Sequence, residues 1–420
     1  MEGGHRLEGQ VKISGAKNSA LKLMAASLLA QGTTRLFNVP RIADVFTMVE
    51  VLERLGAVVE FESDVMSIDT SGEISTVAPY DLVRRMRASI NVLGPLLARL
   101  GHARVAMPGG CNIGSRTIDM HEHCLEQLGV RFHFDHGYLE GIVDRLVGRT
   151  IVLDFPSRGT TENLLTAATL AEGTTVIENE AREPDIVDLA EFLNRMGAQV
   201  SGAGTSTIEI SGVSRMAATE FWVGSDPIEA GTYALAVLAT RGKAELLGAR
   251  HTEMELFLEK LKSTGVDWHP GKSGIQVSAR SRPRAVDFAT LPFPGFPTDL
   301  QPPMMAYLAT AEGTSIITEN VFESRFLHMQ ELARMGADIR TEGHHAIVRG
   351  VPRLQAAPVR VSDLRAGAAL LVAALGAEGQ TEIHDVQHLD RGYEDVVGKL
   401  SRLGAHIQRL RTQEPSEQPV

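Results

Sequence analysis

Hydrophobic and polar residues repeat one order of patterns along the chain. An alanine- and leucine-rich run over Ser19 to Ala30 predicts a helix, and Thr34 to Phe37, after a glycine turn, predicts a short strand. An amphipathic pattern over Ala43 to Leu55 predicts a second helix. A Gly-Ala break and the alternating residues Val58 to Phe61 then predict another strand. Each unit is therefore predicted to be a mixed α/β module.

Two short phrases indicate that this unit occurs six times. The first, small-x-Gly-Thr or a weaker copy of it, has its glycine at Gly32, Gly101, Gly173, Gly242, Gly313 and Gly379. The second, Leu-x-x-Leu-Gly-Ala or a looser copy, has its glycine at Gly56, Gly129, Gly197, Gly265, Gly336 and Gly404. Successive glycines are 66 to 72 residues apart in the first set and 68 to 73 in the second. A period of about 70 residues predicts six repeated modules.

The first helix of a module is apolar nearly all round, as Leu164 to Leu170 and Ala366 to Leu375 show. Such a helix is buried on every side. We therefore expect modules packed around central helices, in two lobes of three modules each. A cleft between two lobes is a common place for a ligand.

Charge and composition exclude several classes of protein. The chain of 420 residues has 41 basic and 52 acidic side chains, a formal charge of -11, so nucleic acid and anionic membranes are not expected partners. No run of about 18 uncharged apolar residues predicts a membrane span. The N-terminus lacks the pattern of a secretory signal, and two cysteines, Cys111 and Cys124, suit a reducing compartment. We expect a cytoplasmic protein in which local cations hold any anionic ligand.

The strongest candidate for chemistry is Cys111, in the stretch Met107 to Asp119. Three glycines surround this cysteine, which suits a loop that carries a reactive group rather than a core. The pKa of an unperturbed thiol is about 8.5, and Arg116, close in the sequence, would favour the thiolate form. Cys111 could therefore donate a proton or attack carbon. Cys124, within a helical pattern, is expected to be a small buried residue.

Other charged residues occur where anions could bind. Lys17 and Asn18, in Ser-Gly-Ala-Lys-Asn, begin an apolar helix, where free N–H groups favour an anion. Asp299 follows a proline-rich loop that begins at Phe293 and could act as a general base. Arginines that could bind phosphate or carboxylate occupy turn-like places at Arg87, Arg116, Arg325, Arg365 and Arg391.

These phrases, in this order, resemble the UDP-N-acetylglucosamine 1-carboxyvinyltransferase family, enolpyruvyl transferases of the EPSP synthase superfamily. The resemblance runs from about Leu7 to Leu410 and includes Pro-Gly-Gly-Cys-x-Ile-Gly-x-Arg, Ala-Arg-Glu-Pro-Asp, Phe-Pro-Thr-Asp-Leu-Gln and Asp-Arg-Gly-Tyr-Glu. It implies an α/β fold, a two-lobed inside-out barrel of six βαβαββ repeats. One lobe would be residues 17–225 and the other 1–16 plus 226–410, with residues 411–420 as a disordered tail.

The resemblance also implies a reaction, transfer of the enolpyruvyl group of phosphoenolpyruvate to the 3'-hydroxyl of UDP-N-acetylglucosamine with release of phosphate, without a metal or cofactor. This step begins peptidoglycan precursor synthesis. Cys111 matches the family's proton donor and the target of fosfomycin, and Asp299 matches the base for the sugar hydroxyl. Lys17, Arg116 and Arg391 match cations around phosphoenolpyruvate, and Arg325 and Arg365 match further cations of the site. The resemblance places the nucleotide sugar at Asn18, Arg87, Arg116, Thr117, Ile118, Asp119, Met120, Ser157, Arg158, Gly159, Asp299 and Val321.

Two stretches on the nucleotide side depart from the family pattern. Relatives commonly have Ser-Val-Gly-Ala-Thr where this chain has Ser157 to Thr161, and Arg-Pro-Val-Asp where it has Arg116 to Asp119. We expect Arg158 to point to solvent; the alternative is a contact with a phosphate of a different nucleotide. Three other functions stay open: transfer to another nucleotide such as uridine monophosphate, transfer to shikimate 3-phosphate, and a catalytically idle sensor of nucleotide sugars. The Cys111 loop argues against transfer to shikimate 3-phosphate. The presence of both a candidate acid, Cys111, and a candidate base, Asp299, argues against the idle sensor.

Overall fold

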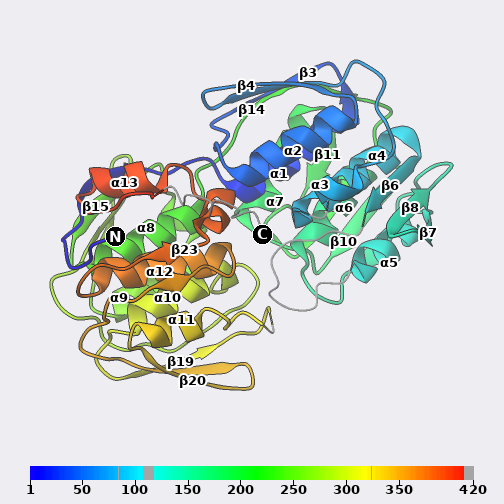
Figure 1. The fold of residues 1–420 in the computed structure, drawn as a ribbon. Helices are drawn as coiled ribbons and strands as arrows, with labels where there is room; N and C mark the ends of the chain where they lie inside the picture. The colour runs from blue at the N-terminus through cyan, green and yellow to red at the C-terminus, as the bar shows by residue number, and fades with distance from the viewer. Residues whose placement is uncertain (84, 107–117, 323, 411–420) are drawn as a thin grey trace, which may run out of the picture.

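The computed structural model describes residues 1–83, 85–106, 118–322 and 324–410. Its chain forms two lobes in Figure 1, one coloured blue to green and the other mainly green to red, with the blue N-terminal segment also in the second lobe. Both lobes mix helices and strands, which confirms the predicted α/β class. Within the described residues, every helix is too short or too polar to cross a bilayer.

Two sheets of the first lobe repeat one topology, in which a parallel pair of strands continues into an antiparallel hairpin, and the third has the antiparallel strands alone. The first sheet has the order β14 (Glu220–Trp222), β3 (Thr33–Phe37), β5 (Val65–Asp69) and β4 (Val58–Glu62). The second has the order β9 (Thr150–Val152), β10 (Thr174–Glu178), β12 (Thr207–Ser211) and β11 (Gln199–Ser201). The third has β6 (His102–Ala106), β8 (Tyr138–Ile142) and β7 (Arg131–Asp135), and a short pair joins β2 (Ala30–Gln31) to β13 (Met216–Ala217).

The first two sheets of the second lobe have the same topology. Its first sheet has the order β1 (Glu8–Lys12), β15 (Lys243–Leu247), β17 (Gly274–Ser278) and β16 (Asp267–Pro270). Its second has the order β18 (Phe288–Ala289), β19 (Thr314–Thr318), β21 (His345–Arg349) and β20 (Asp338–Glu342). A third, shorter sheet pairs β22 (Val359–Arg360) with β23 (Ile383–His384). The N-terminal strand β1 thus belongs to a sheet of the second lobe, paired in parallel with β15.

Apolar helices fill the centre of each lobe and the sheets lie outside them, as Figure 1 shows. The central helices are α1 (Lys17–Ala26), α4 (Leu93–Leu100), α6 (Arg158–Ala168), α8 (Pro227–Ala239), α10 (Gln301–Leu308) and α12 (Leu364–Gly376). Every side chain of α10, and all of α12 from Leu364 to Leu375, is buried. The predicted burial of the first helix on all sides is therefore confirmed in these modules.

Amphipathic helices follow the central ones and pack with one face on the lobe. They are α2 (Ala43–Arg54), α5 (Asp119–Gln127), α7 (Pro184–Arg195), α9 (Glu255–Ser263), α11 (Met329–Arg334) and α13 (Val396–Arg402). The remaining helical segments are α3 (Tyr80–Val83), η1 (Ser27–Leu29), η2 (Arg87–Val92), η3 (His251–Glu253), η4 (Thr298–Leu300) and η5 (Val386–Arg391). The predicted elements of the first module agree with α1, β3, α2 and β4 to within a few residues, the error expected at helix ends.

Two chain segments cross between the lobes and pair with each other. The N–H of Ala16 donates to the carbonyl of Gly224 (2.7 Å), and the N–H of Asp226 donates to the carbonyl of Ser14 (2.9 Å). A Cβ on Gly15 would lie 1.8 Å from the carbonyl oxygen of Asn38, so only glycine fits there. This paired connection joins the lobes close to the first turns of α1 and α8.

Buried apolar residues form two clusters, one per lobe. One cluster extends from Ala20 to Val223, and the other combines Leu7 to Ile13 with Ile228 to Ala405. The gaps between the clusters support lobe boundaries near residues 16 and 225, which remain our proposal. The predicted disordered tail, residues 411–420, lies outside the described residues.

Candidate active site

A cavity of about 560 Å³ lies where the two lobes face each other. Residues of both lobes line it, including Lys17 and Arg158 of the first and Asp299 and Arg365 of the second. It brings together most of the residues singled out from the sequence. Those that line it are Lys17, Asn18, Arg87, Asp119, Met120, Ser157, Arg158, Gly159, Asp299, Val321, Arg325, Arg365 and Arg391.

Among the described residues of the predicted site, Ile118 is the one that does not line the cavity. Ile118 is buried at the start of α5 and belongs to the apolar cluster of the first lobe. Cys111, Arg116 and Thr117 lie outside the described residues. Their predicted roles stay predictions.

The central helices begin at this cavity. Lys17, Arg158 and Pro227 are the first residues of α1, α6 and α8, and each lines it. The 3-10 helices η2 and η4, which lead into α4 and α10, also contribute to the wall, as does the start of α12 at Leu364. A helix N-terminus has unpaired N–H groups and about half a positive charge, so these helices make the cavity attractive to anions.

Asp44 connects two cations that the sequence assigned to one anion site. Its carboxylate lies 2.6 Å from Nζ of Lys17 and accepts hydrogen bonds from Nε (2.9 Å) and Nη2 (3.3 Å) of Arg391. Lys17 and Asp44 belong to the first lobe and Arg391 to the second, so the cluster joins the lobes. Burial would raise the pKa of Asp44, but the charges of Lys17 and Arg391 and their hydrogen bonds lower it overall.

The start of α1 is positioned by the paired connection between the lobes. Asp226 caps α8 by accepting from the N–H groups of Ile228 (2.8 Å) and Glu229 (3.1 Å). Its second oxygen accepts from the N–H of Lys17 (3.1 Å). One buried carboxylate therefore fixes the first turns of two central helices, which sets where Lys17 enters the cavity.

Asp299 lies in η4 and is bound by two arginines of its own lobe. Nη2 of Arg325 is 2.5 Å from one carboxylate oxygen, and Nη2 of Arg365 is 2.9 Å from the other. Burial raises the pKa of Asp299, but Arg365, Arg325 and then Arg158 outweigh it, and the pKa falls well below its usual range. In this arrangement Asp299 is a strong anion and a weak base.

The expectation that Arg158 points to solvent is wrong. Nε of Arg158 lies 3.0 Å from a carboxylate oxygen of Glu183, and its Nη1 lies 3.9 Å from one of Asp185. Only 29% of the arginine side chain is exposed. Both carboxylates come from the phrase Ala-Arg-Glu-Pro-Asp at the start of α7, which the resemblance singled out without assigning partners. Their charges draw the guanidinium into the cavity wall rather than out to water.

Further polar residues of the wall were missed from the sequence. Lys22 is buried in α1 between Glu162 and Asp185, with ion pairs to both. His121 is buried beside Gly159, where a Cβ would lie 3.0 Å from its ring. Burial, then the charge of Arg87, lowers the pKa of His121 to about 4, so it is neutral at pH 7. A lysine inside an apolar helix and an isolated histidine carry no motif, so the sequence offered no signal.

Glu180, in the loop after β10, is a buried acid close to Glu183 of the cavity wall, and the protonation of Glu180 can be tested. The side chain is 1% exposed, and neither carboxylate oxygen has a hydrogen-bond partner among the described residues. Burial, and then the charge of Glu183, raises its pKa to about 8. The folded chain therefore binds a proton that the unfolded chain releases between about pH 4.5 and 8.

The free energy of unfolding is expected to fall as the pH rises through that window. Glu180 contributes up to about 1.4 kcal/mol of this fall per pH unit. Glu180→Gln, which imitates the protonated acid, should be more stable than the parent chain at pH 9 and equal to it at pH 5. Urea unfolding at both values measures this, with Glu178→Gln, an exposed glutamate of β10, as the matched control. Equal gains at pH 5 and 9 would contradict the assignment.

Comparisons with known proteins agree over nearly the whole chain. A family model described as EPSP synthase (3-phosphoshikimate 1-carboxyvinyltransferase) matches residues 1–400. The chain is 52% identical to the UDP-N-acetylglucosamine 1-carboxyvinyltransferase of Thermotoga petrophila over 97% of each chain. Against the protein of that name from Corynebacterium jeikeium, identity is 52% over 97% of this chain and 98% of the other. The enolpyruvyl transferase NikO from Streptomyces tendae superposes with a TM-score of 0.86, at 27% identity and 96% coverage of both chains.

Proposed function

Since the chain belongs to the EPSP synthase family, we propose that it transfers the enolpyruvyl group of phosphoenolpyruvate to the 3'-hydroxyl of UDP-N-acetylglucosamine, releasing phosphate. One observation carries this proposal: 52% identity over 97% of the chain with a relative named for that enzyme. The reaction would begin peptidoglycan precursor synthesis. The proposed compartment of the reaction is the cytoplasm.

The proposed reaction is an addition followed by an elimination. Cys111 donates a proton to C3 of phosphoenolpyruvate, and C2 becomes oxocarbenium-like. The sugar 3'-oxygen, losing its proton to Asp299, attacks C2 and gives a tetrahedral adduct. Loss of phosphate from C2 and of a proton from C3 then restores the double bond in the product.

Charges in the cavity support the binding of these two anions. Lys17 and Arg391, with Arg116, are the proposed cations for phosphoenolpyruvate, and Arg325 and Arg365 are further cations of the site. Among the described residues, Lys17, Arg391, Arg325 and Arg365 are each paired with a carboxylate of the protein. Binding therefore requires an exchange of partners, in which substrate phosphate and carboxylate replace Asp44 and Asp299 beside these cations. Such an exchange leaves Asp299 with fewer positive neighbours, which raises its pKa and makes it a better base.

The starts of α5, α6 and η2 support a site for the nucleotide diphosphate. Asp119, Ser157 and Arg87 begin or precede these helices, and all three line the cavity. Helix N-termini are common binding places for phosphate groups. Closure of the lobes over both substrates would exclude water and strengthen every one of these contacts.

A second candidate function is transfer to another nucleotide, for example uridine monophosphate. The observation that favours it is Arg158, which departs from the pattern of the relatives and lies in the cavity wall. A positive side chain there could compensate a differently placed phosphate.

Release of inorganic phosphate tests both functions. We expect release with phosphoenolpyruvate and UDP-N-acetylglucosamine, at least about tenfold slower release with uridine monophosphate or shikimate 3-phosphate, and inhibition by fosfomycin. A preference for uridine monophosphate would select the second candidate. Binding of the nucleotide sugar without phosphate release in any mixture would indicate the idle sensor.

A further inference from the structure

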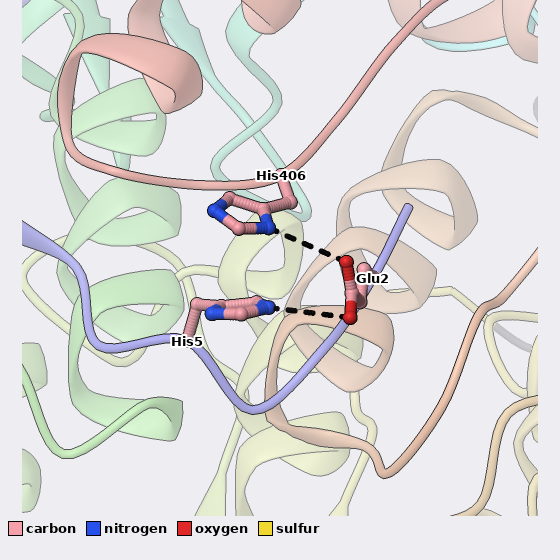
Figure 2. A group of neighbouring side chains, drawn as sticks. All are labelled: Glu2, His5 and His406. Carbon is pink, nitrogen blue, oxygen red and sulfur yellow. Dashed lines mark hydrogen bonds and ion pairs between the residues drawn. The ribbon is translucent and has the colours of Figure 1, made fainter.

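Two histidines and one glutamate meet on the second lobe, where the N-terminal segment lies beside the chain that follows α13. Figure 2 shows the imidazoles of His5 and His406 stacked, with both facing the carboxylate of Glu2. One potential ligand atom from each residue lies within 4.8 Å of the other two. None of the three residues is among those that line the interlobe cavity.

Contacts in this group are long for direct bonds, with one weak hydrogen bond, from His406, and one ion pair, from His5. Nε2 of His5 lies 3.6 Å from one oxygen of Glu2, and Nδ1 of His406 lies 3.3 Å from the other. A charge-assisted hydrogen bond is shorter, about 2.7 to 2.9 Å. In a tetrahedral site with bonds of about 2.1 Å, ligand atoms lie about 3.4 Å apart, which is close to both distances although they run to different oxygens of Glu2. Because the two imidazoles are stacked, a small rotation of one ring is needed to aim both nitrogens at one ion.

The backbone holds the three residues in place before any ion binds. The N–H of Glu2 donates to the carbonyl of His406 (2.9 Å), and the N–H of Gly3 donates to that of Gly379 (3.0 Å). A turn at Gly4, whose φ is +84°, returns the chain so that His5 and Glu2 face each other. A Cβ on Gly3 would lie 2.3 Å from two backbone oxygens, so the close approach of this segment requires glycine.

Donor type and exposure indicate which ion would bind. Two imidazole nitrogens with one carboxylate suit Zn²⁺, whereas Mg²⁺ prefers oxygen ligands alone. The side chains are 37% exposed for His5 and 59% for Glu2 and His406, so an ion can enter and keep water in its fourth position. We propose that Glu2, His5 and His406 bind one Zn²⁺, which fastens the N-terminal segment to the chain after α13.

Zinc titration of the full-length chain without an affinity tag tests this proposal. All proteins carry Cys111→Ser, so that this thiol does not contribute to zinc binding. Calorimetry is expected to show one Zn²⁺ per chain and no response to Mg²⁺. His5→Ala, His406→Ala and Glu2→Gln should each weaken zinc binding by at least about tenfold, since even groups that only support a ligand account for that much.

The matched control is His133→Ala, which removes one exposed histidine from β7 in the other lobe and should leave zinc binding unchanged. Thermal unfolding gives an independent readout, because Zn²⁺ at about 10 µM should raise the Tm of the parent and the control but not of the three site variants. Their Tm without metal shows whether they fold. Equal zinc affinity in the parent and in the site variants, or no uptake by the parent at that concentration, would overturn the proposal.

Discussion

Asp299→Asn is expected to lower kcat by about 10³-fold, within the usual range for the loss of a general base. An amide cannot take the proton of the sugar hydroxyl. The carboxylate also balances the buried guanidinium groups of Arg325 and Arg365. Removing one partner of a buried ion pair costs about 3 to 5 kcal/mol, so part of the effect could come from unfolding. Circular dichroism and the affinity for UDP-N-acetylglucosamine separate the two causes.

Asp287→Asn is the matched control for this substitution. Asp287 lies in the same lobe, outside the residues that line the cavity, and accepts a hydrogen bond from the N–H of Ile316. The same chemical change there should leave kcat within about twofold, as for surface substitutions away from special features.

The pH dependence of the parent enzyme distinguishes a base from a residue that only positions the arginines. In the free enzyme the pKa of Asp299 is well below its usual value, because Arg365 and Arg325 are its partners. The pH profile of kcat/KM reports the pKa values of the free enzyme, so its acid limb should lie at low pH. Once substrate anions bind the arginines, the pKa rises, so the acid limb of kcat should lie at higher pH. Coincident limbs, or a kcat limb that persists in Asp299→Asn, would exclude the base role.

The repeated fold could be predicted because each module carries its own local signals. Glycines at the turns, such as Gly56 and Gly197, have φ near +100°, a conformation that other residues adopt rarely, so they recur in every copy. The order of strands within a sheet could not be derived from these signals. Pairing of β1 with β15 joins residues more than two hundred positions apart, and only the family resemblance implied it.

Cations of the candidate site could be predicted from motifs, but their partners could not. Asp44 is a single aspartate in the first turn of α2, where such residues commonly only stabilise the helix end. Its contact with Arg391 depends on how two lobes meet, which no local pattern describes. Arg158 shows the same limit, since solvent exposure is the usual state of an arginine and Glu183 is more than twenty residues away.

Cys111→Ser is expected to lower turnover by about 10³-fold at pH 7 while UDP-N-acetylglucosamine affinity stays within about tenfold, if the cysteine acts as a general acid. A serine hydroxyl is a far weaker acid than a thiol, so proton donation to C3 of phosphoenolpyruvate is lost. Its size is similar, so contacts with the nucleotide sugar should change little. Phosphate release and calorimetry with the nucleotide sugar measure the two quantities separately.

Cys124 provides a matched control within the same chain. It is 2% exposed in α5, and burial, then the charge of Asp154, raises its pKa to about 11. Such a thiol stays protonated and is a poor nucleophile. Cys124→Ala should therefore keep its turnover and take up one fosfomycin by intact mass, whereas Cys111→Ser should take up none. Full turnover in Cys111→Ser would show that this thiol does not take part in the reaction. Another group would then have to donate the proton to C3, in a cavity where His121 is neutral and Asp299 is ionised.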